Sequence, residues 1–458
     1  MQQIPMQPPV ERLFTNASLG RLIWPLIVEQ LLSITLGMAD VIMVATLGEA
    51  AVSGVSLVDN INILINNIFA ALATGGAVVC AQYIGRRDEK MVSLTARQLI
   101  YAVTAAAAVL MCAGLVFRYP LLSFVFGDID TEVMDSAQRY FFVTLFSLPG
   151  IALYNGCAAL FRAQGNSKVS MFIALLVNIL NIGGNALLVF GLGWHVEGVA
   201  VPTLAARTAA ALVLLALLYR DKPYRGAPAI DIHGLCKFEF DLKIIRHILA
   251  IGIPNGLENS MFQIGKIVVL TLIASFGTTA IAANAAANTV ASLETLPGAA
   301  IGLAMLTVVG QCLGAGRPEE AAYFARRLLV ITYVSMIALN APLLVFSEQI
   351  AAVFHLQPDT MQLARRMFCV HGLFSMLIWP LSFTLPNALR AAGEAKFTMI
   401  VSMLSMWTIR IGVSYLFAAY TGFGALGVWY AMILDWAVRS AVFSLRFKQG
   451  AWKRRRLV

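Results

Sequence analysis

Ten charged side chains stand in stretches of the chain that are otherwise apolar. They are Glu29, Asp40, Asp59, Arg207, Glu258, Lys266, Glu294, Arg410, Asp435 and Arg439. A charge in the middle of a membrane costs about 2.5–3.5 kcal/mol on insertion scales, so such residues face the interior of a bundle or a watery cavity. A carboxylate held there can take up and release a proton, or bind a sodium ion together with amide and hydroxyl oxygens. These residue types therefore indicate ion handling.

Amide side chains accompany the carboxylates of the first half. They form two rows with helical spacing: Asn178, Asn181 and Asn185 in one stretch, and Asp59, Asn62 and Asn66 in another. Residues three and four apart share one face of a helix. Asp40 lies in an earlier stretch, and Thr203 directly follows Pro202. The amides could line an ion or substrate site, or they could serve only as hydrogen bonds between helices.

The second half offers a looser set of polar candidates. We expect it to contribute Glu258, Gln263, Lys266, Asn284, Asn288 and Glu294 to a substrate cavity, with Glu29, Asp59, Asn62, Asn66 and Asn178 from the first half. Lys266 could instead pair with Glu258 or Glu294 and only neutralise it. Arg410 and Asp435 are expected at similar depth, where they would form a structural ion pair.

The composition fits only a membrane protein. Of 458 residues, 59% are hydrophobic and 12% are charged, and the mean hydropathy is +0.78. Average soluble domains carry about 25% charged residues. The net charge of +9 comes from dispersed basic residues, which suits loops beside an anionic membrane leaflet and not nucleic acid. These numbers exclude a soluble enzyme, a secreted disulfide scaffold and a disordered chain.

The apolar stretches predict an all-α membrane protein with twelve transmembrane helices. Their expected ranges are 20–46, 52–84, 94–118, 136–160, 168–192, 196–219, 244–275, 281–313, 322–346, 363–389, 397–420 and 424–446. Basic residues gather in alternate loops, so the positive-inside rule places both termini in the cytoplasm, in a plasma (inner) membrane. The six cysteines form no CxxC pair and the five histidines show no metal spacing, so we expect no metal and no cofactor.

The two halves of the sequence align with each other. Pro25 matches Pro254, Glu29 matches Glu258, and Gln82 matches Gln311, each 229 residues apart. The pair Arg162 and Arg390 keeps almost the same separation. Since six spans make each half, the halves should be two pseudo-symmetric lobes related by an axis along the membrane normal. The expected division is an N-terminal lobe over 1–219, a cytoplasmic linker over 220–243, a C-terminal lobe over 244–446 and a basic tail over 447–458.

Several motifs together resemble one family. They are Glu29-Gln30 after Trp24-Pro25, Asp40 in Gly-Met-Ala-Asp, Arg162-Ala-Gln-Gly, the Asn-rich stretch ending in Val-Phe-Gly191, Val196-Glu-Gly198 and Val309-Gly-Gln-Cys-Leu-Gly-Ala-Gly316. In order and spacing the set is similar to the multidrug and toxic compound extrusion (MATE) family, from about Leu19 to Phe447. The resemblance implies two six-helix lobes and cation-coupled export of organic compounds, often cationic and amphipathic.

The resemblance also implies roles for individual residues. Asp40 falls at the position of the family's cation-coupling aspartate, and Asn181, Asn185 and Thr203 fall at the positions of its partners. Where many members have a second carboxylate, this chain has Asn185. The resemblance therefore implies one coupling carboxylate in this lobe, with Asp40 titrating alone or with Asp59 or Arg207 nearby. Either H⁺ or Na⁺ could be the coupling ion, with Na⁺ held at Asp40.

The expected function is an antiporter that exports small organic compounds by alternating access, with no catalytic residues. A flippase for lipids or lipid-linked oligosaccharides of related architecture is the alternative, and it would favour a strongly cationic cavity. A membrane enzyme or channel is a third possibility, against which the repeat and the missing catalytic motif argue. The expected partners are small organic substrates and the lipid bilayer, without nucleic acid, and the expected state is a monomer.

Overall fold

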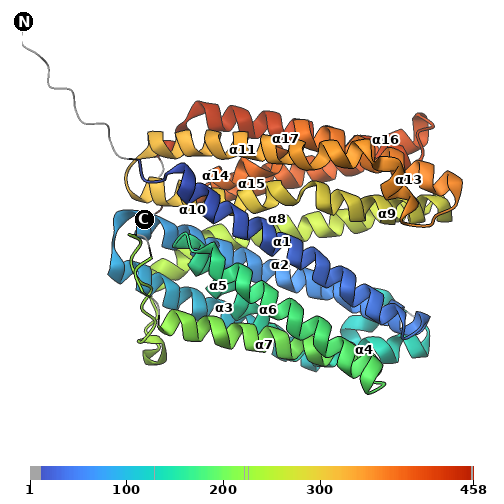
Figure 1. The fold of residues 1–458 in the computed structure, drawn as a ribbon, viewed down its shortest axis with the longest axis horizontal. Coiled ribbons are helices and arrows are strands. Elements are labelled where there is room, and N and C mark those ends of the chain that lie inside the picture. Colours follow the sequence, from blue (N-terminus) through green and yellow to red (C-terminus); the bar gives the residue numbers. More distant parts are fainter. Residues whose placement is uncertain (1–11, 128, 221, 225, 455–456, 458) are drawn as a thin grey trace, which may run out of the picture.

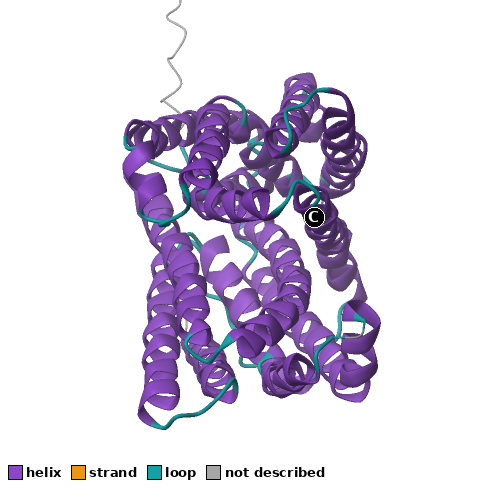
Figure 2. Cartoon of the chain, turned by 90° about the vertical axis from the view of Figure 1, so that its right-hand side faces the viewer, coloured by secondary structure: helices purple, strands orange, loops and turns teal. Residues whose placement is uncertain are grey.

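The structure is a computed structural model that describes residues 12–127, 129–220, 222–224, 226–454 and 457. In this part of the chain, helices and their connecting loops make up the fold, with one isolated bridge between Tyr224 and Ala227 (Figure 2). Parts of the predicted linker and tail, namely 221, 225, 455, 456 and 458, lie outside the described residues. The all-α prediction is confirmed.

The first half folds into one group of helices (Figure 1). Its elements are α1 (Asn16–Ala45), α2 (Glu49–Arg86), α3 (Glu89–Phe126), α4 (Thr131–Phe146), α5 (Leu148–Ala163), α6 (Ser167–Asn185), the π-helical η1 (Ala186–Gly191) and α7 (Glu197–Tyr219). A short 3-10 helix, η2 (Leu235–Lys237), lies in the linker that follows.

The second half forms the other group of helices. Its elements are α8 (Leu242–Ala274), α9 (Thr278–Glu294), α10 (Leu296–Gly314), α11 (Pro318–Val345), α12 (Ser347–Ala352), α13 (Pro358–Leu377), the π-helical η3 (Pro380–Thr384), α14 (Pro386–Ala391), α15 (Ala395–Ser405), the π-helical η4 (Met406–Ile411), α16 (Gly412–Tyr420), α17 (Ala425–Gln449) and the 3-10 helix η5 (Ala451–Arg454). The two groups are the N lobe and the C lobe.

Most predicted spans reappear with small shifts at their ends. The expected span over 94–118 is longer, since α3 runs from Glu89 to Phe126, and the expected span over 281–313 is divided at Thr295 into α9 and α10. Ten described helices are long and apolar enough to cross a membrane, and the number rises to twelve when each bent pair is one span. The bent pairs are α4 with α5, at 47°, and α13 with α14, at 64°. The second bend contains Pro380 and Pro386, whose missing N–H groups and rigid rings interrupt a helix. The expected spans over 136–160 and 363–389 are thus broken helices.

The repeat seen in the sequence is also present in the backbone. Gly48 begins α2 with φ 103°, and Gly277 begins α9 with φ 94°. Such left-handed angles favour glycine, because a Cβ would clash with the backbone. Pro25 and Pro254 lie inside the matching helices α1 and α8. Each half therefore turns from its first to its second span in the same way.

The lobes meet at one end of the molecule, where α1 begins and α17 ends; we call it the terminal end. Here α2 and α10 cross so closely that a Cβ on Gly85 would lie 2.0 Å from the Gln311 carbonyl oxygen. The reciprocal Cβ on Gly314 would lie 1.9 Å from the Gln82 carbonyl oxygen. Toward the opposite end, the far end, the two groups diverge (Figure 1).

Candidate functional site

Four polar residues of the N lobe form one hydrogen-bonded chain. The Asn185 amide donates to Asp40 Oδ1 at 2.7 Å and to Asn181 Oδ1 at 3.0 Å. Asn181 in turn donates to Thr203 Oγ1 at 2.8 Å, and this hydroxyl donates to the Val199 carbonyl. Helices α1, α6 and α7 each supply a member, so the chain joins three spans. The sequence predicted that these four residues act together, and the structure brings them together.

Further charged groups lie around Asp40. Asp59 and Arg207 are near enough to act on its carboxylate electrostatically. Asp59 accepts a hydrogen bond from Tyr140 at 3.2 Å, and Arg207 donates to Ser147 Oγ at 2.8 Å. Two carboxylates and one guanidinium thus share a small volume of the N lobe. With both carboxylates ionised these three groups carry a net charge of −1, and binding of one proton or sodium ion brings the net charge to zero.

The oxygens beside Asp40 suit a small cation. Asn185 is fully buried, and its Oδ1 accepts no hydrogen bond from any described residue. A buried acceptor without a donor is costly, and a sodium ion would satisfy it, whereas a proton would bind the Asp40 carboxylate instead. Asp40 and Thr203 add a carboxylate and a hydroxyl oxygen. The described residues contain no group of three or more His, Cys, Asp or Glu side chains that could hold a metal ion.

Other predicted N-lobe residues line a cavity of about 450 Å³. Glu29, Asn66 and Asn178 are in its wall, together with Arg162 and Arg207. Asn66 accepts a hydrogen bond from Asn155 at 2.9 Å. Asn178 donates to the Ala174 carbonyl of its own helix. Asn62 lies on the same helix as Asn66 and is half-buried.

Glu29 and Glu258 form matching ion pairs in the two lobes. Arg162 Nη1 lies 2.8 Å from Glu29 Oε1, and Arg390 Nη2 lies 2.8 Å from Glu258 Oε1. All four positions had matched in the sequence repeat, but the pairing itself was not predicted. In both lobes the pair ties the first span to the fourth. Each glutamate therefore joins two helices of its lobe through an ion pair, and Glu29 also lies in the wall of the N-lobe cavity.

The C lobe contains a cavity of about 380 Å³ with predicted residues in its wall. Gln263, Lys266, Asn284 and Asn288 line it, as does Arg410. Trp429 donates from Nε1 to Asn284 Oδ1 at 3.2 Å. Ile63 of the N lobe is also part of the wall, so this cavity lies where the lobes face each other.

The expected ion pair between Arg410 and Asp435 is not found, and neither is the alternative pairing of Lys266. Lys266 pairs with neither Glu258 nor Glu294; its Nζ lies over the Phe262 ring, 5.4 Å from the centroid. Arg410 does not pair with Asp435, but contacts Met432 Sδ at 3.1 Å. Asp435 accepts a hydrogen bond from Ser405 instead. Packing of η4 against α8 and α17 directs Arg410 along the cavity wall, which helical spacing alone does not reveal.

Glu294 is placed differently from the prediction. Its side chain is fully buried and contacts His371 Nδ1 of α13, so it lies inside the C lobe and not at the cavity wall. Asn340 donates to the Glu294 backbone carbonyl at 3.1 Å. The sequence gives no signal for this pair, because the two residues are 77 positions apart and no motif joins them.

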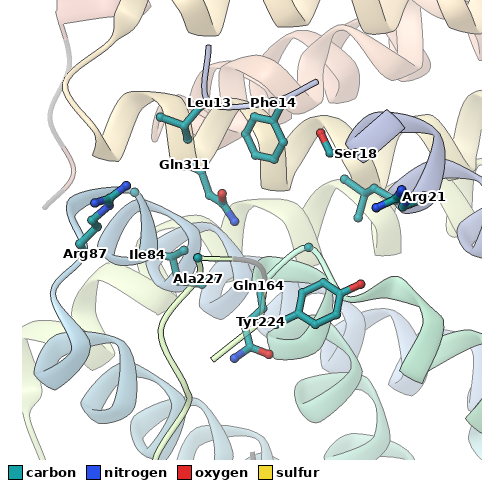
Figure 3. Close-up of a pocket in the computed structure, with 14 residues that line it drawn as sticks. Leu13, Phe14, Ser18, Arg21, Ile84, Arg87, Gln164, Tyr224, Ala227 and Gln311 are labelled. Atoms are coloured by element: carbon teal, nitrogen blue, oxygen red, sulfur yellow. The ribbon is translucent and has the colours of Figure 1, made fainter. Parts of the chain in front are cut away.

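The terminal end holds a second set of symmetric contacts. Gln82 Nε2 donates to the Ala391 carbonyl of the other lobe at 2.7 Å, and Gln311 Nε2 donates to the Ala163 carbonyl at 2.6 Å. A cavity of about 190 Å³ opens beside them, and Gln164 and Gln311 are among the residues from the two lobes that line it (Figure 3). Gln82 and Gln311 thus hold the two lobes together at this end.

A protein-family model matches both halves of the chain. The MatE model matches residues 25–187 and again 254–416, which is more than half of the chain and preserves the separation of 229. The chain belongs to the MatE family. The family identity settles the class of protein: it is a multi-pass membrane transporter and not an enzyme.

Other MatE proteins are similar over almost their whole length. The probable multidrug resistance protein NorM of Thermotoga maritima is 26% identical over 95% of this chain and 92% of its own. The uncharacterized transporter YisQ of Bacillus subtilis is 27% identical, with 98% and 96% covered. A solved multidrug resistance MATE transporter in an outward-facing conformation has a TM-score of 0.87 at 20% identity and covers 94% of this chain and 96% of its own. The MatE fold thus accounts for both lobes.

Proposed function

We propose that this MatE protein exports small amphipathic organic compounds, driven by an inward gradient of H⁺ or Na⁺ that acts at Asp40. The observation that carries the proposal is the chain of hydrogen bonds from Asp40 through Asn185 and Asn181 to Thr203. It links α1 to α6 and α7, so charging or neutralising the carboxylate changes how these helices hold together. Relatives named multidrug resistance proteins support the choice of substrates.

Alternating access supplies the transport step. The lobes are joined at the terminal end and diverge toward the far end, which supports an outward-open state with the termini in the cytoplasm of a plasma (inner) membrane. An ion entering from outside would reach Asp40 near the far end of α1. Binding there biases the equilibrium between the two states only by as much as the ion prefers one of them. We propose that a monomer is sufficient, since the N-lobe cavity and the C-lobe cavity lie within one chain.

The proposal is tested by dye efflux in everted membrane vesicles, with pH and sodium gradients imposed separately. Asp40→Asn keeps the shape and the hydrogen-bonding partner but removes the charge. We expect normal insertion and loss of gradient-driven efflux, while the exposed Asp359→Asn serves as the matched control. Efflux retained by Asp40→Asn would overturn the assignment of the coupling group. Wild-type efflux that responds to neither gradient would overturn ion coupling.

A further inference from the structure

The C-lobe cavity contains two cations that form no ion pair with a carboxylate in the described part of the chain. Lys266 is exposed to the space inside the cavity, and Arg410 in the same wall is only 8% exposed. Arg410 Nε has no hydrogen-bond partner among the described residues. Both side chains lie over the Phe262 ring, with 5.4 Å from Lys266 Nζ and 5.1 Å from Arg410 Cζ to its centroid. The ring contact holds them side by side but does not neutralise them.

The carboxylates in the neighbourhood are engaged elsewhere. Glu258 pairs with Arg390 at 2.8 Å and with Arg439 at 3.7 Å. Asp435 is fully buried and bonded to Ser405, and it acts on Arg410 and Arg439 only from a distance. Glu294 contacts His371, which packs its ring edgewise against Trp429. The cavity therefore carries an excess of positive charge.

Uncompensated charge at membrane depth is costly and is usually retained for use. The remaining wall is suited to the rest of an amphipathic molecule. Asn284, Asn288 and Ser292 supply polar groups on α9, and Trp429, Met432 and Leu270 supply aromatic and apolar surface. Ile63 closes the cavity from the N lobe.

The repeat gives an independent reason to look at these two residues. At the separation of 229, Arg410 corresponds to Asn181 and Lys266 to Gly37, whereas Asp40 corresponds to Val269. The C-lobe face that corresponds to the proposed ion site thus has its carboxylate replaced by valine and its amide by arginine. A face of this composition cannot bind a cation, but it can bind an anionic group.

We propose that Lys266 and Arg410 bind the carboxylate or phosphate of an amphipathic substrate, whose apolar body packs against Trp429 and Met432. This inference rests on the proposed export function and names the class of compound carried. The transported molecules then include zwitterions and anions, because a purely cationic compound meets repulsion in this cavity. The lone ammonium and guanidinium groups each donate charge-assisted hydrogen bonds to the anion.

The test is binding of two matched dyes to the purified full chain in detergent, followed by fluorescence anisotropy. One dye is a rhodamine with a free carboxyl group, and the other is the methyl ester of the same rhodamine. A hydrogen bond to a charged group is worth about 1.5–3 kcal/mol, so we expect the free acid to bind at least about tenfold more tightly. In Lys266→Gln this preference should fall several-fold, because Arg410 alone remains, with the ester's affinity unchanged or higher.

Two further variants serve as controls, one for the charge at position 266 and one for the removal of a lysine elsewhere on the same helix. Lys266→Arg should keep the preference for the acid, because it keeps the charge. Lys243→Gln removes an exposed lysine at the start of the same helix and should change neither affinity. Equal binding of the two dyes by the wild type, or an equal loss of both in Lys266→Gln, would overturn the anionic subsite. Binding is measured without a gradient, so failure of ion coupling at Asp40 would leave these results intact.

A soluble carboxylate and a lipid phosphate share the same chemistry. Competition with a short-chain phosphatidylglycerol, against short-chain phosphatidylcholine as the control, distinguishes them. Displacement of the acid dye by the anionic lipid alone would assign the subsite to a lipid headgroup. If neither lipid displaces the dye, the subsite belongs to soluble organic acids and zwitterions. If neither dye binds to any variant, both the subsite and the export of such compounds are overturned.

Discussion

Glu29 and Glu258 occupy matching positions in the two lobes, yet their surroundings differ. Glu29 has Arg162 at 2.8 Å and accepts a hydrogen bond from Ser170 at 2.6 Å. Glu258 has Arg390 at 2.8 Å and also Arg439 at 3.7 Å. Both carboxylates are 5% exposed, so an unpaired charge at either place would be strongly unfavourable.

This difference predicts unequal effects of two equivalent substitutions. Arg162→Met removes the cation beside Glu29, and loss of one partner of a buried pair costs about 3–5 kcal/mol. Arg390→Met leaves Glu258 with Arg439, so the loss of stability should be clearly smaller. Thermal unfolding in detergent, followed by tryptophan fluorescence, measures both. Adding Glu29→Gln to Arg162→Met should restore part of the stability, and equal melting temperatures for the two single variants would contradict the explanation.

At the scale of elements, the crossing of α2 and α10 depends on two glycines. A Cβ at Gly314 would lie 1.9 Å from the Gln82 carbonyl oxygen, which is backbone and has no room to turn aside. The same holds for Gly85 against Gln311. Even one methyl group therefore requires the two helices, and with them the two lobes, to move apart at the terminal end.

Gly314→Ala should widen the terminal end. Spin labels at the exposed Lys90 and Glu319, one in each lobe, report the separation by electron–electron double resonance. We expect a longer distance in Gly314→Ala than in the unsubstituted chain. Gly412→Ala is the control, since a Cβ at Gly412 meets nothing within 4 Å. An unchanged distance in Gly314→Ala would show that the crossing does not set the spacing of the lobes.

Spacing along the chain predicted what lies on one helix, and it did so well. Asn181 and Asn185 share a face because they are four residues apart, and the family resemblance placed Asp40 and Thr203 beside them. Contacts between helices that are far apart in the sequence were harder to predict. The partner of Glu294 is His371, which depends on how α9 and α13 pack. The Glu29–Arg162 pair could have been predicted, because both of its members recur together in the repeat as Glu258 and Arg390.

At the scale of the whole molecule, two buried side chains connect the lobes reciprocally. Gln82 reaches the carbonyl of Ala391, and Gln311 reaches that of Ala163. Each bond crosses from one lobe to the other, and the repeat makes them equivalent. A rotation of the lobes that opens the terminal end must break both, so they stabilise the present conformation.

Replacing both glutamines by alanine should shift the conformational equilibrium. Each hydrogen bond is worth about 0.5–1.5 kcal/mol, so together they favour the closed terminal end by about 1–3 kcal/mol. Spin labels at Glu49 and Thr278, where α2 and α9 begin at the far end, should then show a larger population with a short distance. The exposed Gln449→Ala is the matched control. The same distance distribution in the double variant and the control would contradict this role.

The register of the duplication has a further consequence for ancestry. At the repeat separation of 229, Asp40 corresponds to Val269 in the other half, and Lys266 corresponds to Gly37. A symmetric ancestor assembled from two identical chains would have carried both groups twice, or neither. In the single chain, the first half carries the carboxylate and the second half carries the ammonium group. Two copies of either half alone would lack one of these groups, so we expect that they make no working transporter.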